Sequence, residues 1–153
     1  MSDDAQVSDT IDVQAPPEVV FAILADPRQH SRIDGSGSVG AVIAAPDRIT
    51  AKGQTFTVRM KLFGVPYLIS NRVVEFEAGR TIAWRHFTAN RWRYELTPTA
   101  DGGTQVTETF DMSRADAVTT AVVRAAKFPE RNREGIAGSL ERLKKAAEAD
   151  ALA

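Results

Sequence analysis

The spacing of hydrophobic positions alternates along the chain between a period of two and a period near 3.6 residues. Residues 6–14 open with a period of two, since Val7, Ile11 and Val13 share one parity and only Asp9 interrupts it. Alternation of this kind is typical of a strand with one covered face. We therefore expect a strand over residues 6–14.

A helical segment is predicted directly after this strand. Pro17 opens an apolar run, and proline suits the first turn of a helix because its missing N–H would have no partner there. Asp26 and Pro27 end the run, since the residue before a proline is disfavoured in helical conformation. A second short helix is expected from there through Asp34.

Between Val39 and Ser113 the hydrophobic period returns to two, which predicts a run of strands. The expected strands span residues 39–44, 47–51, 54–63, 66–77, 81–89, 91–98 and 104–112. Short turns rich in glycine, proline and aspartate separate them, and such links favour antiparallel hairpins. Alternation of apolar and polar side chains indicates a sheet with one covered and one wet face.

The remaining residues predict helix. Ser113 and Asp116 are spaced like a capping box. One helical face is expected to hold Val118, Val122, Ala125, Ile136, Leu140, Leu143 and Ala147. Pro129 and Gly135 predict an interruption near 127–130, followed by a final helix to about residue 148. Because this interruption and Gly135 leave the backbone less constrained than that of the sheet, we expect the final helix to act as a lid.

Length and composition indicate one globular domain over residues 1–153, and the order of the predicted elements makes it α+β. Hydrophobic residues make up 43% and charged residues 25%, which is ordinary globular usage. The absence of cysteine excludes disulfides, thiolate zinc sites and cysteine nucleophiles, and favours a cytoplasmic location.

Charge narrows the possible partners. The formal net charge is -1, so no general excess of positive charge favours nucleic-acid binding. The acidic N-terminus predicts no signal peptide, and no apolar run reaches the ~18–20 residues of a membrane span. The oligomeric state stays open.

Two sequence segments and the C-terminal amphipathic helix carry a family resemblance. The segments are residues 15–27, APPEVVFAILADP, and residues 72–85, RVVEFEAGRTIAWR. With the order of elements, they make the chain resemble the START/Bet v 1-like (SRPBCC) superfamily, and within it the polyketide cyclase/dehydrase-like proteins. Many members have a tryptophan-rich segment after the second helix, whereas this chain has HSRIDGSGSV at residues 30–39.

The resemblance implies a helix-grip fold: a curved antiparallel sheet of about seven strands around a long C-terminal helix, with two short helices after the first strand. It also implies an internal cavity for a small hydrophobic molecule. Shared parity or helical face assigns the following ligand-binding candidates: Phe56, Val58, Met60, Trp84, Trp92, Tyr94, Phe110 and Leu140. The alternative is that these side chains simply fill a core.

Two ionisable side chains share the apolar face of the predicted sheet. His86 has the parity of Trp84, and Glu108 has the parity of Phe110. Burial would lower the pKa of the histidine and raise that of the glutamate. The pair could then serve as catalytic acid and base, and Tyr94 could donate to a ligand oxygen. The alternative is a structural role, or a place at the cavity mouth.

Other motifs give weaker signals. His30 and Asp34 stand four residues apart and form either a gate or a local surface pair. Residues 35–40 fit G-x-G-x-x-G but precede a strand rather than a helix, which disfavours dinucleotide binding and indicates a loop. Two distant histidines and no nucleophile elbow predict no metal, no cofactor and no hydrolase triad.

Two main hypotheses follow. The first is a carrier or sensor that binds a small hydrophobic lipid-, polyketide- or aromatic-like ligand in an internal cavity. The second is a cofactor-independent cyclase or dehydratase that uses acid–base groups in that cavity. A protein-interaction module is a third class, for which the sequence holds no distinct signature.

Overall fold

Seven strands form one antiparallel sheet in the order β1-β7-β6-β5-β4-β3-β2. The structure is a computed structural model and describes residues 6–35, 39–86, 90–113, 117–125 and 128–153. The strands are β1 (Gln6–Val13), β2 (Val39–Ala44), β3 (Thr55–Leu62), β4 (Val65–Glu77), β5 (Thr81–Arg85), β6 (Arg91–Pro98) and β7 (Thr104–Asp111). Strands β2 to β7 therefore follow one another as hairpins, and β1 adds to the free edge of β7.

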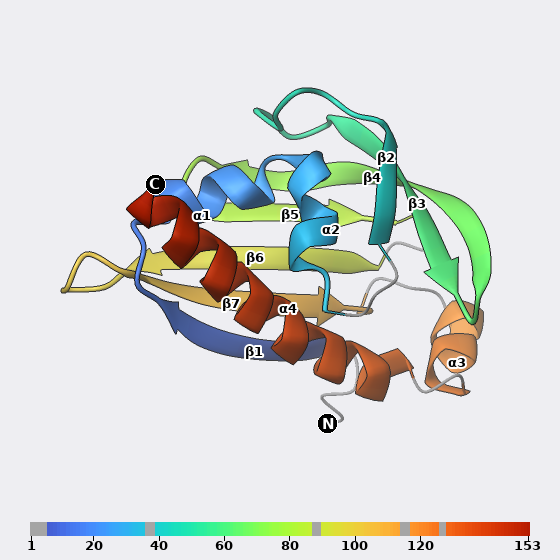
Figure 1. Cartoon of the computed structure of the whole chain (residues 1–153). Helices are drawn as coiled ribbons and strands as arrows, with labels where there is room; N and C mark the ends of the chain where they lie inside the picture. Colours follow the sequence, from blue (N-terminus) through green and yellow to red (C-terminus); the bar gives the residue numbers. More distant parts are fainter. Residues whose placement is uncertain (1–5, 36–38, 87–89, 114–116, 126–127) are drawn as a thin grey trace.

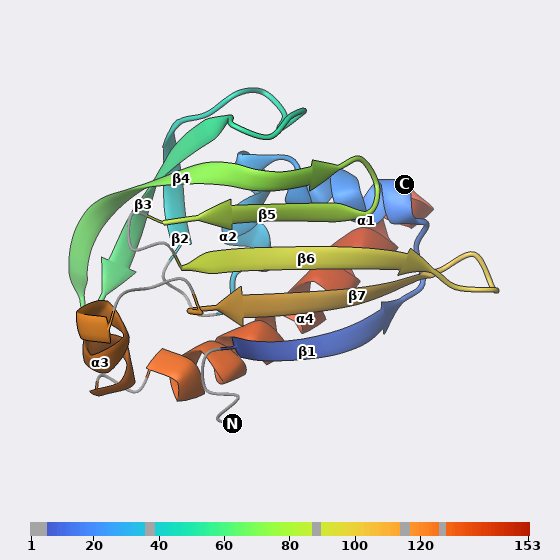
Figure 2. The same cartoon turned by 180° about the vertical axis from the view of Figure 1, so that it is seen from behind.

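The sheet is strongly curved. Its register slips between β2 and β3, and again between Val73 and Glu75 where β4 pairs with β5. Such irregularities bend a strand and increase its local twist. Figures 1 and 2 show β2, β3 and the adjoining part of β4 turned away from the plane of β5, β6 and β7. The curvature gives the sheet a concave face.

Five helical segments are found among the described residues. They are α1 (Pro17–Leu24), the 3₁₀ turn η2 (Pro27–Gln29), α2 (His30–Ile33), α3 (Ala117–Ala125) and α4 (Phe128–Leu152). The short helices after the first strand are where the sequence predicts them. The Asp26 side chain accepts a hydrogen bond from the Arg28 amide at 3.0 Å. This capping bond explains why the chain stops one helix and starts the next at this point.

Helix α4 lies across the concave face and buries its apolar stripe there. Ile136, Leu140, Leu143 and Ala147 are each at most 1% exposed. They recur at i, i+4, i+7 and i+11, the spacing that places side chains on one helix face. Figure 1 shows α4 crossing the sheet beside α1 and α2. The helix-grip fold expected from the sequence is confirmed.

A glycine contact fixes the middle of α4. A Cβ placed on Gly35 would lie 2.4 Å from the backbone nitrogen of Ser139, so only glycine allows this approach. The Gly35 amide also donates to Ser139 Oγ at 2.8 Å. Nearer the C-terminus, both Arg32 guanidinium Nη atoms donate to the Asp150 carboxylate. Gly35, read from the sequence as part of a loop, is therefore the point where that loop packs on the helix.

Two strand predictions need correction. Residues 47–51 form no strand, because the Ile49 amide donates to the carbonyl of Ala25, at the end of α1, at 2.7 Å. Ile49 is fully buried by this loop, so its apolar character reflects contact with the core rather than strand pairing. Strand β5 ends at Arg85, short of the predicted residue 89. Residues 87–89 lie outside the described residues.

The predicted C-terminal helical face also needs correction. Val118 and Val122 of α3 are 75% and 61% exposed, so they do not continue the buried stripe of α4. Figures 1 and 2 show α3 turned away from the axis of α4. Helix α4 runs through Gly135 without a break, and Pro129 falls in its first turn. Asp116 of the predicted capping box lies outside the described residues.

Candidate functional site

A cavity of about 910 Å³ lies between the concave face of the sheet and helices α2 and α4. Its volume matches that of pockets that hold small molecules. Strands β2 to β7 contribute about half of the lining residues. Helix α4 contributes the opposite wall through its first half, from Arg131 to Ser139.

Seven of the eight predicted ligand-binding residues line this cavity. They are Phe56, Val58, Met60, Trp84, Trp92, Tyr94 and Phe110. Leu140 does not line it, because its side chain is buried in the core beneath α4. Sequence reasoning missed the β4 residues Tyr67, Ile69 and Asn71, although their shared parity could have revealed them.

Aromatic rings form much of the cavity wall. The His30 ring stacks on Trp84, with 4.8 Å between centroids and 17° between planes. Trp84 also contacts Phe56 edge-on and lies 5.7 Å from the ring of Tyr94. Trp92 packs on Phe110 with 4.6 Å between centroids. Stacked and edge-on ring contacts of this kind stabilise the wall beyond the area that they bury.

The predicted surface pair of His30 with Asp34 is wrong, because His30 is buried. Both residues line the cavity, so the alternative of a gate stays a prediction. His30 is 7% exposed, and its Nε2 donates to the carbonyl of Leu24 at 2.8 Å. Burial lowers the pKa of His30, and the bond to Leu24 and the charge of Asp26 oppose that shift. Asp34 instead accepts from the Val39 amide at 2.9 Å. His30 is thus a structural part of the aromatic wall.

His86 is held in its neutral form. The Trp92 indole Nε1–H donates to His86 Nε2 at 2.9 Å, which leaves the ring proton on Nδ1. Nδ1 is shielded from solvent and has no hydrogen-bond partner among the described residues. Burial lowers the pKa of His86 to about 4.

Glu108 is held in its neutral form as well. Tyr94 Oη donates to Glu108 Oε2 at 2.8 Å, and the side chain is 2% exposed. Burial raises the pKa of Glu108 to about 8; the bond from Tyr94 opposes the shift and the charge of Asp34 adds to it. Burial and the neighbouring Glu108 also raise the pKa of Tyr94.

Three polar side chains continue across neighbouring strands. Arg72 pairs with Arg85 and Arg85 with Arg91, so the positions next to them, Asn71, His86 and Asn90, are lateral neighbours. The Oδ1 atoms of Asn71 and Asn90 are shielded from solvent and have no partner within the described parts of the chain. The cavity therefore carries two groups of uncharged polar side chains, this row and the Tyr94–Glu108 pair.

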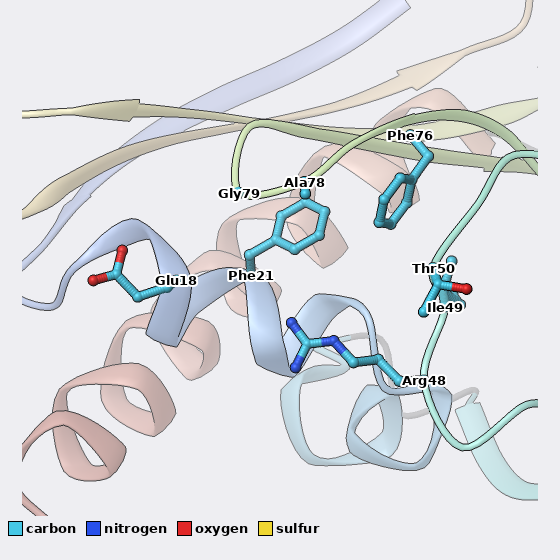
Figure 3. A pocket seen from close by; sticks show the side chains of 8 residues that line it. All are labelled: Glu18, Phe21, Arg48, Ile49, Thr50, Phe76, Ala78 and Gly79. Carbon is cyan, nitrogen blue, oxygen red and sulfur yellow. The ribbon is translucent and has the colours of Figure 1, made fainter.

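A second pocket of about 530 Å³ borders α1 (Figure 3). Its floor is the edge-on pair of Phe21 and Phe76, and Figure 3 shows it between α1, the loop around Ile49 and the turn after β4. Glu18 and Arg48 stand at its border. Lacking a covering helix, this pocket is a weaker candidate than the cavity under α4.

The described residues form neither a metal-binding cluster nor a membrane-spanning helix. No three His, Asp or Glu side chains among the described residues gather closely enough to hold a metal ion. Of the helices in the described ranges, none is long and apolar enough to cross a membrane.

Comparison with known proteins identifies the family. Residues 4–148 match the family described as polyketide cyclase / dehydrase and lipid transport. The chain belongs to this family. An uncharacterised protein from Mycobacterium tuberculosis strain H37Rv is 38% identical to this chain over 140 residues. A second, from strain CDC 1551, is 37% identical over 140 residues. The alignments cover 90% of the chain but only 62% of each relative's length.

Solved structures agree on the fold. A Nitrosomonas europaea protein superimposes over 100% of both chains, with a TM-score of 0.76 at 14% identity. The AHSA1-like protein from Aeromonas hydrophila has a TM-score of 0.68 at 19% identity, covering 97% of this chain and 95% of its own. At such identities the likeness carries the fold of the family and no particular ligand.

Proposed function

We propose that this family member binds a small hydrophobic molecule in the cavity between the sheet and α4. One observation carries the proposal: about 910 Å³ of space is walled mainly by aromatic and aliphatic side chains, in a fold whose other apolar side chains pack closely. A well-packed domain leaves few voids larger than a water molecule. The family description, which includes lipid transport, supports the same conclusion.

The lining also limits the chemistry of the ligand. His86 and Glu108 are neutral near pH 7, so the deep polar groups offer hydrogen bonds without charge. Acidic Asp34 and Glu134 outnumber Arg131 along the lining. An uncharged ligand with few polar groups suits this wall better than an anion, whose burial without a paired cation is costly.

Native mass spectrometry of the purified protein tests the proposal. We expect a small apolar molecule to copurify, or added 4-phenylphenol to bind. Met60→Trp narrows the cavity and should lower the occupancy, whereas Ala78→Trp, in the smaller pocket, should leave it unchanged. Equal occupancy in both variants would place the ligand elsewhere, and no binding of either kind would refute the proposal.

Hydrogen exchange tests where the ligand lies. Gly35 and Arg32 fix α4 from about Ser139 to Asp150, so a lid movement is confined to its first turns. Bound 4-phenylphenol should slow amide exchange in residues 130–135 more than in β6. Equal protection of both segments would show that α4 does not move as a lid.

A second candidate function is acid–base catalysis on the bound molecule. The observation in its favour is the Tyr94–Glu108 pair, because a carboxyl with a pKa of about 8 can exchange a proton near neutral pH. His86 is bonded to Trp92 instead, so the two proposed catalytic groups would act separately. Given a copurified substrate, Glu108→Gln should lower turnover roughly 10²-fold with little change in affinity. Unchanged turnover would leave only the binding function.

A further inference from the structure

Most of the exposed large apolar side chains of the described residues gather at one end of the molecule. On the β3–β4 hairpin, Phe63, Val65 and Leu68 are 68%, 63% and 59% exposed, and on α3 Val118 and Val122 are 75% and 61% exposed. Figures 1 and 2 both show α3 beside the tip of this hairpin. We call these five side chains the tip patch.

Helix α3 presents its apolar face outward. Val118, Ala121, Val122 and Ala125 are all exposed and stand at i, i+3, i+4 and i+7. This spacing defines one helix face, which a globular protein normally buries. An exposed apolar face of this kind marks an interaction site more often than a single exposed residue does.

The tip of the β3–β4 hairpin, next to α3, has a bulky residue in an unfavourable backbone conformation. Phe63 and Gly64 form a two-residue turn, and both have positive φ, at 50° and 79°. Asparagine followed by glycine is the usual choice for such a turn, because a bulky side chain is strained in this conformation. A strained, exposed aromatic ring at a protruding tip needs a reason other than stability.

The tip patch borders the cavity. Arg131, which lines the cavity, stacks over the Phe63 ring with 4.4 Å between its Cζ and the ring centroid. Tyr67, on the same hairpin, also lines the cavity and is 38% exposed. A surface that covers the tip patch would therefore face the cavity entrance.

Charge indicates what this surface meets. Residues 55–72, over which β3 and β4 pair, contain Arg59, Lys61 and Arg72 and no acidic residue, in a chain whose net charge is -1. The first turns of α4 carry both signs, so the hairpin supplies the net positive charge. A second copy docked by a twofold axis would set these basic hairpins against each other. Apolar side chains flanked by basic ones suit the surface of an anionic bilayer.

We propose that the tip patch docks onto an anionic lipid bilayer at the entrance of the cavity. Phe63, Val118 and Val122 enter the boundary between headgroups and acyl chains, and Lys61 and Arg59 remain at the headgroups. This inference stands on exposure and charge, and it holds whether or not the cavity binds the ligand proposed above.

Co-sedimentation with vesicles tests the inference. The full chain should sediment with vesicles of phosphatidylcholine mixed with phosphatidylglycerol, less with phosphatidylcholine alone, and less as salt is raised. The double variant Val118→Ser/Val122→Ser should weaken binding roughly tenfold or more. Lys61→Ala should weaken it about fivefold, and only on the anionic vesicles.

Phe63→Asn separates a binding role from a structural one. Asparagine suits the turn, so the thermal midpoint should not fall, while vesicle binding drops roughly tenfold. Leu152→Ser is the matched control, since Leu152 is 90% exposed and directly precedes the C-terminal residue. Figure 1 shows the C-terminus at the opposite end of the molecule from α3. It should bind like the unmodified chain.

Three results would overturn the inference. The first is failure of the unmodified chain to bind either kind of vesicle. The second is undiminished binding by Phe63→Asn and by the double valine variant. The third is a dimer in solution that these variants dissociate, which would assign the tip patch to a second copy of the chain.

Discussion

His86 and Glu108 lie on the same concave face and carry opposite charges when ionised, yet burial leaves both uncharged at neutral pH. The pKa of His86 falls to about 4 and that of Glu108 rises to about 8, in both cases because burial penalises the charged form. Both positions therefore offer hydrogen bonds without charge. The cavity is polar at two places and has no deep ion pair between them.

The aromatic partners of the two side chains favour different protonation states, neutral for His86 and ionised for Glu108. Trp92 donates to the lone pair of His86 Nε2, a bond that exists only in the neutral ring, so this partner and burial agree. Tyr94 donates to the Glu108 carboxyl, which favours the carboxylate and opposes burial. The protonation state of Glu108 is therefore the easier of the two to change. Glu108 is the better candidate for a proton exchange coupled to a ligand.

The largest expected effect is the pH dependence that Glu108 gives to stability. Its pKa is raised from 4.5 to about 8, so the unfolded chain releases this proton first as pH rises. The free energy of unfolding should therefore fall between these two pH values, by up to roughly 4–5 kcal/mol. Glu108→Gln should remove this fall, as measured by urea unfolding from pH 5 to pH 9. An unchanged slope would show that Glu108 is ionised in the folded chain.

His86 should produce a smaller slope of opposite sign. Its pKa is lowered from 6.5 to about 4, so the unfolded chain takes up this proton first as pH falls. Stability should be lost as pH drops through that window, by up to roughly 3 kcal/mol. His86→Gln should reduce the acid sensitivity of the thermal midpoint, while the lowered pKa of His30 preserves part of it. Identical acid profiles would contradict the neutral assignment.

Tyr94→Phe should produce the smallest of the three effects. It removes one buried hydrogen bond and should cost about 1–3 kcal/mol of stability, because Glu108 Oε2 loses its donor. The same change should raise the pKa of Glu108 further, since the bond from Tyr94 favours the carboxylate. A carboxyl-carbon NMR titration of Glu108 measures this directly. A lower pKa in the variant would reverse the proposed role of Tyr94.

Periodicity predicted much of this structure. Strand β3 and the stripe of α4 were correctly placed because their side chains alternate or recur with a clear period. The parity of Trp84 and Phe110 likewise located His86 and Glu108 on the covered face. Local sequence suffices here, because a strand or helix fixes which side chains share a face.

Other features depended on tertiary contacts. Ile49 looked like a strand residue, but it is buried as part of a loop held by Ala25. Leu140 has the helical phase of a cavity residue, yet packs against the core instead. No local pattern shows how far a curved sheet stands from the helix that crosses it.

The sequence by itself determined most of the elements, the apolar faces of the strands and of α4, and the family of this chain. Only the tertiary structure decided that His30 stacks within the wall, that Asn71, His86 and Asn90 stand in one row, and that α3 keeps its apolar face outside. The physical reason is that a side chain's polarity sets its preference for burial, while its neighbours across the sheet, distant in sequence, set what it bonds to.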